Sequence, residues 1–207
     1  MLFLVFSKEP RPHGPWHTPE RHGGCLSHWV GTHMSGVAII HPIMFVRGYA
    51  MYIEVETGRR LREILQGNPM WPDETYHIYV LEENGPVINE PIAPGKQRFM
   101  ILARPAKPLP PDLDYEGTDA MLTRLRDDYG AIVHRLVEDI AGYAILIDVE
   151  SNDQIRALLE PLPITAFVNY EIRPLGSLEG HSRHIRELGL KDPFQSNLPP
   201  ANLPPAD

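Results

Sequence analysis

Residues Gly48–Thr57 read GYAMYIEVET, and residues Gly142–Ser151 read GYAILIDVES. The similarity continues without a gap at an offset of 94 positions, with 12 identities among the 34 pairs of 48–81 against 142–175. Self-similarity at a fixed period indicates a repeated structural unit. This period is too long for a solenoid and suits two small fused domains. The chain of 207 residues is therefore predicted to be a tandem duplication of one unit.

Each copy is predicted to fold in the order β-α-β-β-α-β, which is the ferredoxin-like, or split βαβ, unit. In the second copy, Ser151 and Gln154 form a capping box that begins a helix. Alternating apolar residues predict the strands, and apolar residues at helical spacing predict the helices. The predicted strands are 2–6, 37–46, 49–55, 76–81, 99–103, 131–138, 143–149 and 168–172, and the other predicted helices are 25–33, 59–67 and 118–129.

A unit of this kind covers one face of its sheet with helices and leaves the other face bare. A bare apolar face must be buried, and a second sheet at about 10 Å can bury it. The predicted fold class is α+β, with two fused ferredoxin-like βαββαβ repeats that form an intrachain dimeric α/β barrel. We expect the first repeat over 1–81, a linker over 82–98, the second repeat over 99–175 and a proline-rich C-terminal arm over 176–207.

The composition narrows the class of partners. The formal net charge is −8, whereas a surface that binds nucleic acid needs clustered Lys and Arg. No apolar run approaches the roughly 20 residues of a membrane span. The single cysteine, Cys25, excludes an internal disulfide and fits a reducing compartment. We therefore expect a soluble cytoplasmic protein with no nucleic-acid or membrane partner.

The second copy resembles the muconolactone delta-isomerase family, whose members form dimeric α/β barrels from units of about this length. The matching stretches are Ile140–Ala144, Ile147–Val149 with Ser151, Leu159, Leu162–Pro163, Tyr170–Ile172 and Pro174–Leu175, with Pro69–Pro72 in the first copy. The resemblance implies an isomerase that acts on a small unsaturated acid or lactone in the catabolism of aromatic compounds. It implies no cofactor, and it implies a homo-oligomer of fused pseudo-dimers.

The reaction of this family moves a proton from the carbon beside a lactone carbonyl along the conjugated system. Such a reaction needs a base that titrates near neutral pH and donors to the enolate oxygen. Strand parity directs one side of each strand to the helices and the other side to the second sheet, and the candidates come from that second side or from nearby loops. An imidazole titrates near pH 7, a desolvated Glu can reach that range, and Arg or Tyr can donate. The candidate catalytic residues are His134, His77, Glu138, Glu171 and Arg173, and the candidate substrate-binding residues are Tyr52, Tyr79, Trp71 and His41.

Two other functions remain open. One is a haem-binding or monooxygenase-like barrel, in which His41, His77 or His134 is the single haem ligand. The other is a non-enzymatic module for small-molecule binding or assembly, in which the duplication replaces a homodimer. Five histidines crowd the N-terminal region, but their spacing matches no zinc template, so no metal site is predicted.

Overall fold

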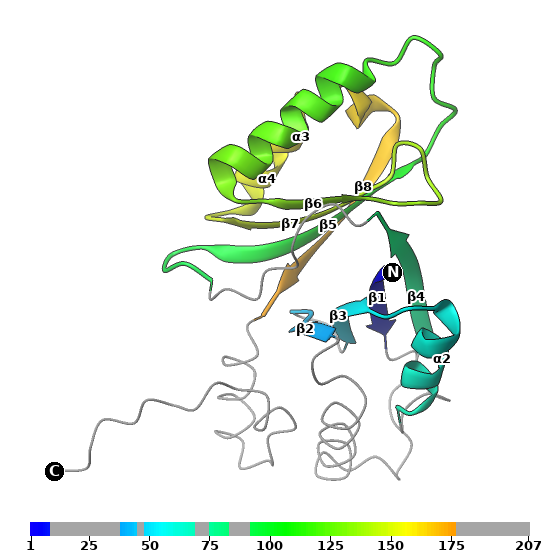
Figure 1. Ribbon diagram of the computed structural model, residues 1–207. Helices are drawn as coiled ribbons and strands as arrows, with labels where there is room; N and C mark the ends of the chain where they lie inside the picture. The colour runs from blue at the N-terminus through cyan, green and yellow to red at the C-terminus, as the bar shows by residue number, and fades with distance from the viewer. Residues whose placement is uncertain (9–37, 45–47, 69–74, 83–91, 177–207) are drawn as a thin grey trace, which may run out of the picture.

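The computed structural model describes residues 1–8, 38–44, 48–68, 75–82 and 92–176. These residues form two four-stranded antiparallel sheets with helices packed against them (Figure 1). Sheet A contains β1 (Leu2–Lys8), β2 (Ala38–Pro42), β3 (Gly48–Glu54) and β4 (Thr75–Leu81), and sheet B contains β5 (Gln97–Pro105), β6 (Ile132–Arg135), β7 (Tyr143–Val149) and β8 (Val168–Leu175). The described helices are α2 (Gly58–Gln66), α3 (Tyr115–Tyr129), α4 (Asn152–Leu159) and the short 3-10 helix η2 (Pro163–Ala166).

The strand order is the same in the two sheets: β2-β3-β1-β4 in sheet A and β6-β7-β5-β8 in sheet B. In each, the first strand of the repeat lies between the third and the fourth, as the ferredoxin-like unit requires. The predicted α+β class with two ferredoxin-like sheets is confirmed. The predicted helix over 25–33, the N-terminal histidines and Trp71 lie outside the described residues.

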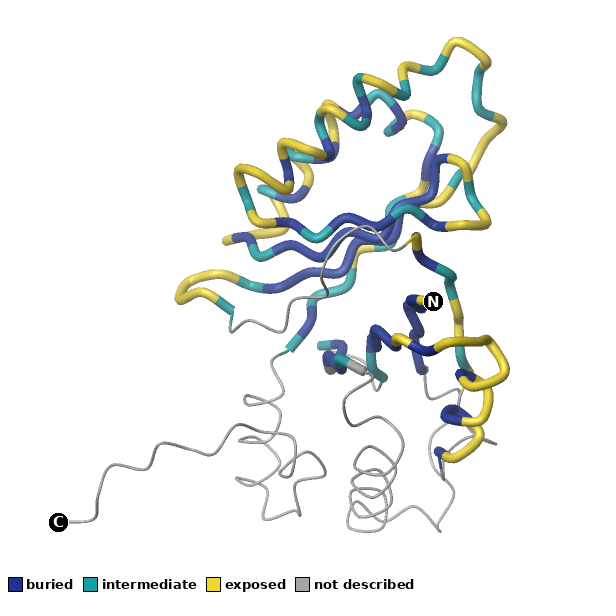
Figure 2. Tube along the Cα trace, viewed as in Figure 1, coloured by how far each residue is buried: buried dark blue, intermediate teal, exposed yellow. Residues whose placement is uncertain are grey.

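Strand parity divides the core into three layers, as the sequence predicts. On the helix side of sheet A, Met51 and Ile53 pack against α2, and on the helix side of sheet B, Ile145 and Ile147 pack against α3 and α4. The third layer, which we call the inter-sheet layer, lies between the sheets. It consists of Leu2, Leu4, Phe6, Ile43, Ala50, Tyr52, Leu81, Met100, Leu102, Leu136, Ala144, Leu146 and Leu175. Figure 1 shows α3 and α4 on one side of sheet B and sheet A on the other, and Figure 2 shows the outer face of α3 exposed.

The sheets also meet along their edges, at two places that we call the seams. At the first seam, Ile43 after β2 bridges to Leu175 of β8, and the Met44 amide donates to the Pro174 carbonyl at 2.9 Å. The second seam joins β4 to the end of β6 through the bridge between Leu81 and Leu136. Its backbone hydrogen bonds are Glu82 N–H to Arg135 O at 3.0 Å and Val137 N–H to Val80 O at 2.9 Å. Within the described residues, the seams leave two separate sheets and do not make a closed barrel.

Local signals account for where the elements begin and end. Asp114 caps α3 by accepting from the Gly117 amide at 2.7 Å, so this helix begins before the predicted Thr118. Gly130 ends α3 at φ 64°, a left-handed conformation that glycine adopts without strain. None of the described helices has the length and apolar character that a membrane-spanning helix needs.

The predicted strand over 131–138 is too long, because β6 ends at Arg135. The chain then turns back, with the Leu136 amide donating to the Gly142 carbonyl at 2.9 Å and the Gly142 amide donating to the Asp139 carbonyl at 2.8 Å. A side chain on Gly142 would place its Cβ 2.5 Å from the Cβ of Asp139. The turn therefore depends on the glycine that opens the repeated stretch, and Glu138 lies on the exposed turn instead of on a strand.

Candidate functional site

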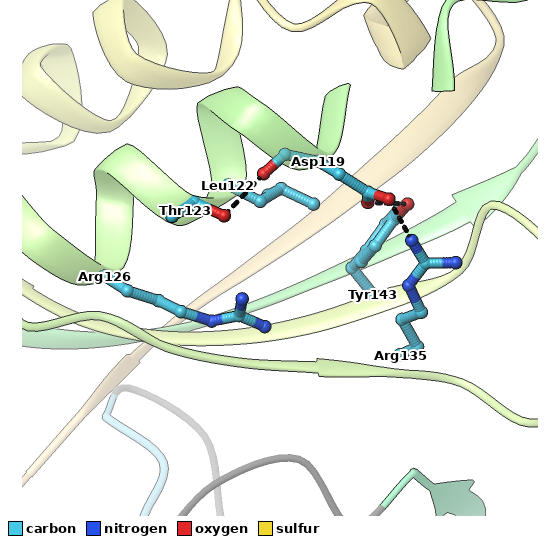
Figure 3. A pocket seen from close by; sticks show the side chains of 6 residues that line it. All are labelled: Asp119, Leu122, Thr123, Arg126, Arg135 and Tyr143. Atoms are coloured by element: carbon cyan, nitrogen blue, oxygen red, sulfur yellow. Dashed lines mark hydrogen bonds and ion pairs between the residues drawn. The ribbon is translucent and has the colours of Figure 1, made fainter. Parts of the chain in front are cut away.

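A pocket of about 440 Å³ lies between α3 and strands β6 and β7, on the helix side of sheet B. Its lining residues are Asp119, Leu122, Thr123, Arg126, Arg135 and Tyr143 (Figure 3). The first four come from successive turns of α3, and the last two come from the hairpin below it. Residues three and four apart share one face of a helix, so this face of α3 forms the roof of the pocket.

One carboxylate, one guanidinium and one phenol meet at the pocket wall. Arg135 and Tyr143 are cross-strand partners on β6 and β7, so their side chains lie next to each other on the same face of sheet B. The Arg135 Nη2 forms an ion pair with the Asp119 Oδ2. The Tyr143 hydroxyl donates to the Asp119 Oδ1 at 3.5 Å, and the Arg135 guanidinium lies 5.7 Å from the centre of the Tyr143 ring.

A second guanidinium is fixed at the other end of the pocket. The Arg126 Nη2 donates to the Val133 carbonyl of β6 at 2.9 Å, which directs the side chain from α3 towards the sheet (Figure 3). Among the described lining residues, Arg126 and Arg135 are basic and Asp119 is acidic, so their formal net charge is one positive unit. Such a pocket favours an anionic ligand.

The protonation states in the pocket follow from burial and from the neighbouring charges. Burial raises the pKa of Tyr143, and the Asp119 carboxylate adds to this effect against the opposing effect of Arg135. Burial alone would lower the pKa of Arg135, but Tyr143 and Asp119 raise it overall. At neutral pH the pocket therefore presents a phenol and a guanidinium as donors beside a carboxylate that can accept.

None of the sequence-predicted residues within the described part of the chain is a lining residue of this pocket, and three of them lie in or beside the inter-sheet layer. The Tyr52 and His134 rings lie 5.9 Å apart, centre to centre, and the Tyr52 hydroxyl reaches the Met100 sulfur at 3.6 Å. His41 is buried on the same face of sheet A as Tyr52. Burial raises the pKa of Tyr52 and lowers the pKa of His134.

Three more predicted residues, Glu171, Arg173 and Tyr79, lie around Phe6 of β1. The Arg173 Nε donates to the Glu171 Oε1 at 2.8 Å, and the Arg173 guanidinium lies 4.6 Å from the centre of the Phe6 ring. Tyr79 packs edge-to-face on Phe6, with the ring centres 6.1 Å apart. His77 is exposed on β4. The structure thus separates the predicted site into two groups and leaves His77 and Glu138 outside both.

Sequence reasoning missed Asp119, Arg126, Arg135 and Tyr143. Strand parity places Tyr143 on the apolar, helix-facing side of its strand, which is where it lies, but parity does not reveal what its hydroxyl group meets. A usable signal exists in the helix: Asp119 and Arg126 are seven residues apart, and this spacing puts two charges on the face that also carries the buried Leu122. Charges that flank the buried residues of an amphipathic helix can border a polar site beneath it.

No known family model matches this chain, and no curated protein matches it in sequence. Among solved structures, it is similar to a candidate chlorite dismutase, with a TM-score of 0.53 and 10% identity over 84% of this chain and 94% of the other. It is also similar to a haem-binding protein from Thermus thermophilus, with a TM-score of 0.50 and 9% identity over 87% of this chain and 93% of the other. At such low identity the likeness shows the fold alone, a ferredoxin-like dimeric α/β barrel. It confirms the fold that the muconolactone delta-isomerase resemblance implies and does not extend to membership in that family.

The pocket does not fit haem ligation. Haem iron is held by His, Cys, Met or Tyr side chains. Among the described lining residues the only such group is Tyr143, which bonds to Asp119 and whose raised pKa favours the neutral phenol. The predicted haem ligands His41, His77 and His134 are absent from the described lining. The described residues also contain no group of three or more His, Cys, Asp or Glu side chains placed to hold a metal ion.

Proposed function

We propose that the pocket between α3 and sheet B is the active site of an isomerase that moves a proton within a small unsaturated organic acid or lactone, without a cofactor. The observation that carries this function is the meeting of the Asp119 carboxylate, the Arg135 guanidinium and the Tyr143 phenol at the wall of one pocket. A base next to two donors is what enolate formation requires.

In this mechanism, Asp119 takes a proton from the carbon beside the substrate carbonyl. The electron pair of the broken C–H bond moves onto the carbonyl oxygen. The Arg135 guanidinium donates a hydrogen bond to this enolate oxygen, and so does the Tyr143 hydroxyl once protonation of Asp119 releases it. The protonated Asp119 then returns the proton to a carbon further along the conjugated system, so no atom or electron is gained or lost. Arg126, held by the Val133 carbonyl, binds the carboxylate of the substrate.

In this proposal the catalytic base is Asp119, whereas the sequence alone predicts His134 or His77. His134 is fully buried in the inter-sheet layer, and His77 is exposed on β4 away from the described lining of the pocket. The fold and the resemblance of the second repeat to muconolactone delta-isomerases support the reaction class. The net positive lining supports an acid as the substrate.

The test is to incubate the full chain with muconolactone in deuterated water and to follow the ring protons by NMR. We expect enzyme-dependent exchange or conversion, and Asp119→Asn should slow it by about 100-fold or more because a general base contributes about 10²–10⁴. The matched control is Asp128→Asn, an exposed aspartate on the same helix, which should leave the rate unchanged.

The outcomes separate this function from the alternatives. Equal loss of rate in both Asp variants, or exchange that survives Asp119→Asn, would remove Asp119 from the mechanism. Shifts of the Arg126 and Arg135 side-chain resonances without any proton exchange would identify a small-molecule-binding module. A new Soret band on adding haem that disappears in His41, His77 or His134 variants would favour the haem-binding barrel instead.

A further inference from the structure

The two histidines near the inter-sheet layer have the same unusual environment. The exposed fraction is 4% for His41 and 0% for His134. Within the part of the chain that the structure describes, the Nε2 atoms of both rings are buried without a hydrogen-bond partner. Buried polar atoms are almost always paired, so two orphaned ring nitrogens in one layer require an explanation.

The two histidines also occupy equivalent places in the two sheets. His41 of β2 pairs with Ala50 of β3, and His134 of β6 pairs with Ala144 of β7. The two alanines correspond to each other in the internal repeat. Each histidine therefore sits on the strand that leads into a seam, two residues before the residue that bridges to the other sheet.

The groups that face His134 leave it neutral. Its Nδ1 lies 3.3 Å from the Glu82 carbonyl oxygen, which can only accept a hydrogen bond, so Nδ1 carries the proton and Nε2 carries a lone pair. Tyr52 of β3 packs on the ring, and Arg126 of α3 acts on it from the other side of sheet B. Burial is the main cause of its lowered pKa, which Arg126 lowers further and the Glu82 hydrogen bond partly offsets.

The surroundings of His41 also favour the neutral form of its ring. Arg98 of β5 and Asp148 of β7 are the charged groups near it, and Tyr52 of β3 lies on the same face of sheet A. Burial lowers the pKa of His41 to about 4, with a further lowering by Arg98 and a smaller opposing effect from Asp148. A second proton on either ring would place a charge on a nitrogen that has no acceptor to receive it.

We propose that His41 and His134 make the two seams between the sheets acid-labile, so that protonation of each ring opens the seam next to it. The closed seam holds the neutral ring, whereas an open seam lets water solvate the charged ring. This destabilisation of the closed seams is absent at pH values well above the ordinary histidine pKa of 6.5. It grows as the pH falls below 6.5, and for His41 it levels off near pH 4, where the closed form also binds the proton.

The test is hydrogen exchange of the full chain at pH 7 and pH 5, corrected for the intrinsic exchange rates. The reporters are the backbone amides that cross the seams: Met44 for the first seam, and Glu82 and Val137 for the second. We expect the protection of Met44 to fall on the order of tenfold or more at pH 5, relative to amides in the middle of β3 and β7. The substitution His41→Met should abolish this fall at Met44 only, and His134→Met should abolish it at Glu82 and Val137 only.

The control is His77→Gln, an exposed histidine on β4, which should leave both seams as pH-sensitive as in the parent chain. If a methionine variant does not fold, the ring carbon-proton shifts of the parent chain decide the question. Rings that stay neutral at pH 5 while the seams are closed support the proposal. A His41 or His134 ring that titrates at pH 6.5 with its seam still protected would overturn it, and so would an equal loss of protection in every strand.

Discussion

In the second repeat, Tyr143 of β7 pairs with Arg135 of β6, whereas in the first repeat the corresponding Tyr49 of β3 pairs with Pro42 of β2. The backbone pairing is the same in both repeats, but the sequence has an uncharged proline in the first repeat where it has an arginine in the second. The arginine that meets Asp119 in the second repeat is thus a difference between the two repeats at one cross-strand position.

On the faces of the two sheets that meet in the inter-sheet layer, some positions hold the same residue type in both repeats and others differ. The histidine opposite an alanine is present in both sheets. The position that holds the Arg98–Asp148 pair between β5 and β7 holds Leu2–Glu54 between β1 and β3. The two sheets therefore contribute the same backbone pairing to the inter-sheet layer but different charged residues. Mutation of these charged residues can remove the difference.

Among the substitutions that exchange a residue between the repeats or remove a single polar group, the largest effect on stability is expected at the Arg98–Asp148 pair. Arg98 donates to both Asp148 oxygens at 2.7 and 2.8 Å, and the exposed fractions of the two side chains are 8% and 20%. Arg98→Leu copies the first repeat but leaves Asp148 unpaired and largely buried, so the free energy of unfolding should fall by about 2–4 kcal/mol. Urea denaturation at pH 7 measures this change.

Two further variants control for the loss of the charge itself. Arg59→Leu removes an arginine from an ion pair with Glu63, but this side chain is 89% exposed, so the change should stay within about 0.5 kcal/mol. The double substitution Arg98→Leu with Asp148→Leu should recover much of the lost stability, because apolar pairs replace buried ion pairs well. Equal effects of Arg98→Leu and Arg59→Leu would contradict this account.

A smaller effect is expected at the turn between β6 and β7. In Gly142→Ala the new Cβ would meet the Asp139 Cβ at 2.5 Å and the Leu136 Cδ1 at 2.9 Å, so the turn must shift. We expect a loss of about 1–3 kcal/mol in thermal or urea unfolding. Gly58→Ala is the matched control, because a Cβ there meets nothing within 4 Å and should change stability by about 0.5 kcal/mol or less. A tolerated Gly142→Ala would show that the repeated glycine is not needed for this turn.

The smallest effect is expected from Tyr52→Phe. The place of Tyr52 on β3 is taken by Leu146 on β7, and the Tyr52 hydroxyl reaches only a weak acceptor, the Met100 sulfur at 3.6 Å. Removing this hydroxyl should change the free energy of unfolding by less than about 1 kcal/mol, whereas Tyr52→Ala should cost about 3–5 kcal/mol through loss of the buried ring. If Tyr52→Phe costs as much as Tyr52→Ala, the hydroxyl makes a stronger bond than the one to sulfur.

The sequence by itself determined the duplication, the order of the strands and the face of the sheet on which each side chain lies. These features are local: alternation has a period of two, a helix has a period of 3.6, and Thr57 and Ser151 accept hydrogen bonds from the amides three residues later. The two-sheet core also followed, because a ferredoxin-like unit leaves an apolar face that must be covered.

Only the tertiary structure decided where the charged and titratable groups meet. Asp119 and Arg135 come together because α3 packs over β6, and the sequence does not encode that packing as a motif. His134 and Glu171 lie at the same level of sheet B but on its two outer strands, because parity fixes the face of a residue and does not show which strands lie between two residues. The seams decided that His41 and His134 are buried, since each strand leads to a contact with the other repeat. Side chains distant in sequence meet through packing, and packing depends on the whole fold.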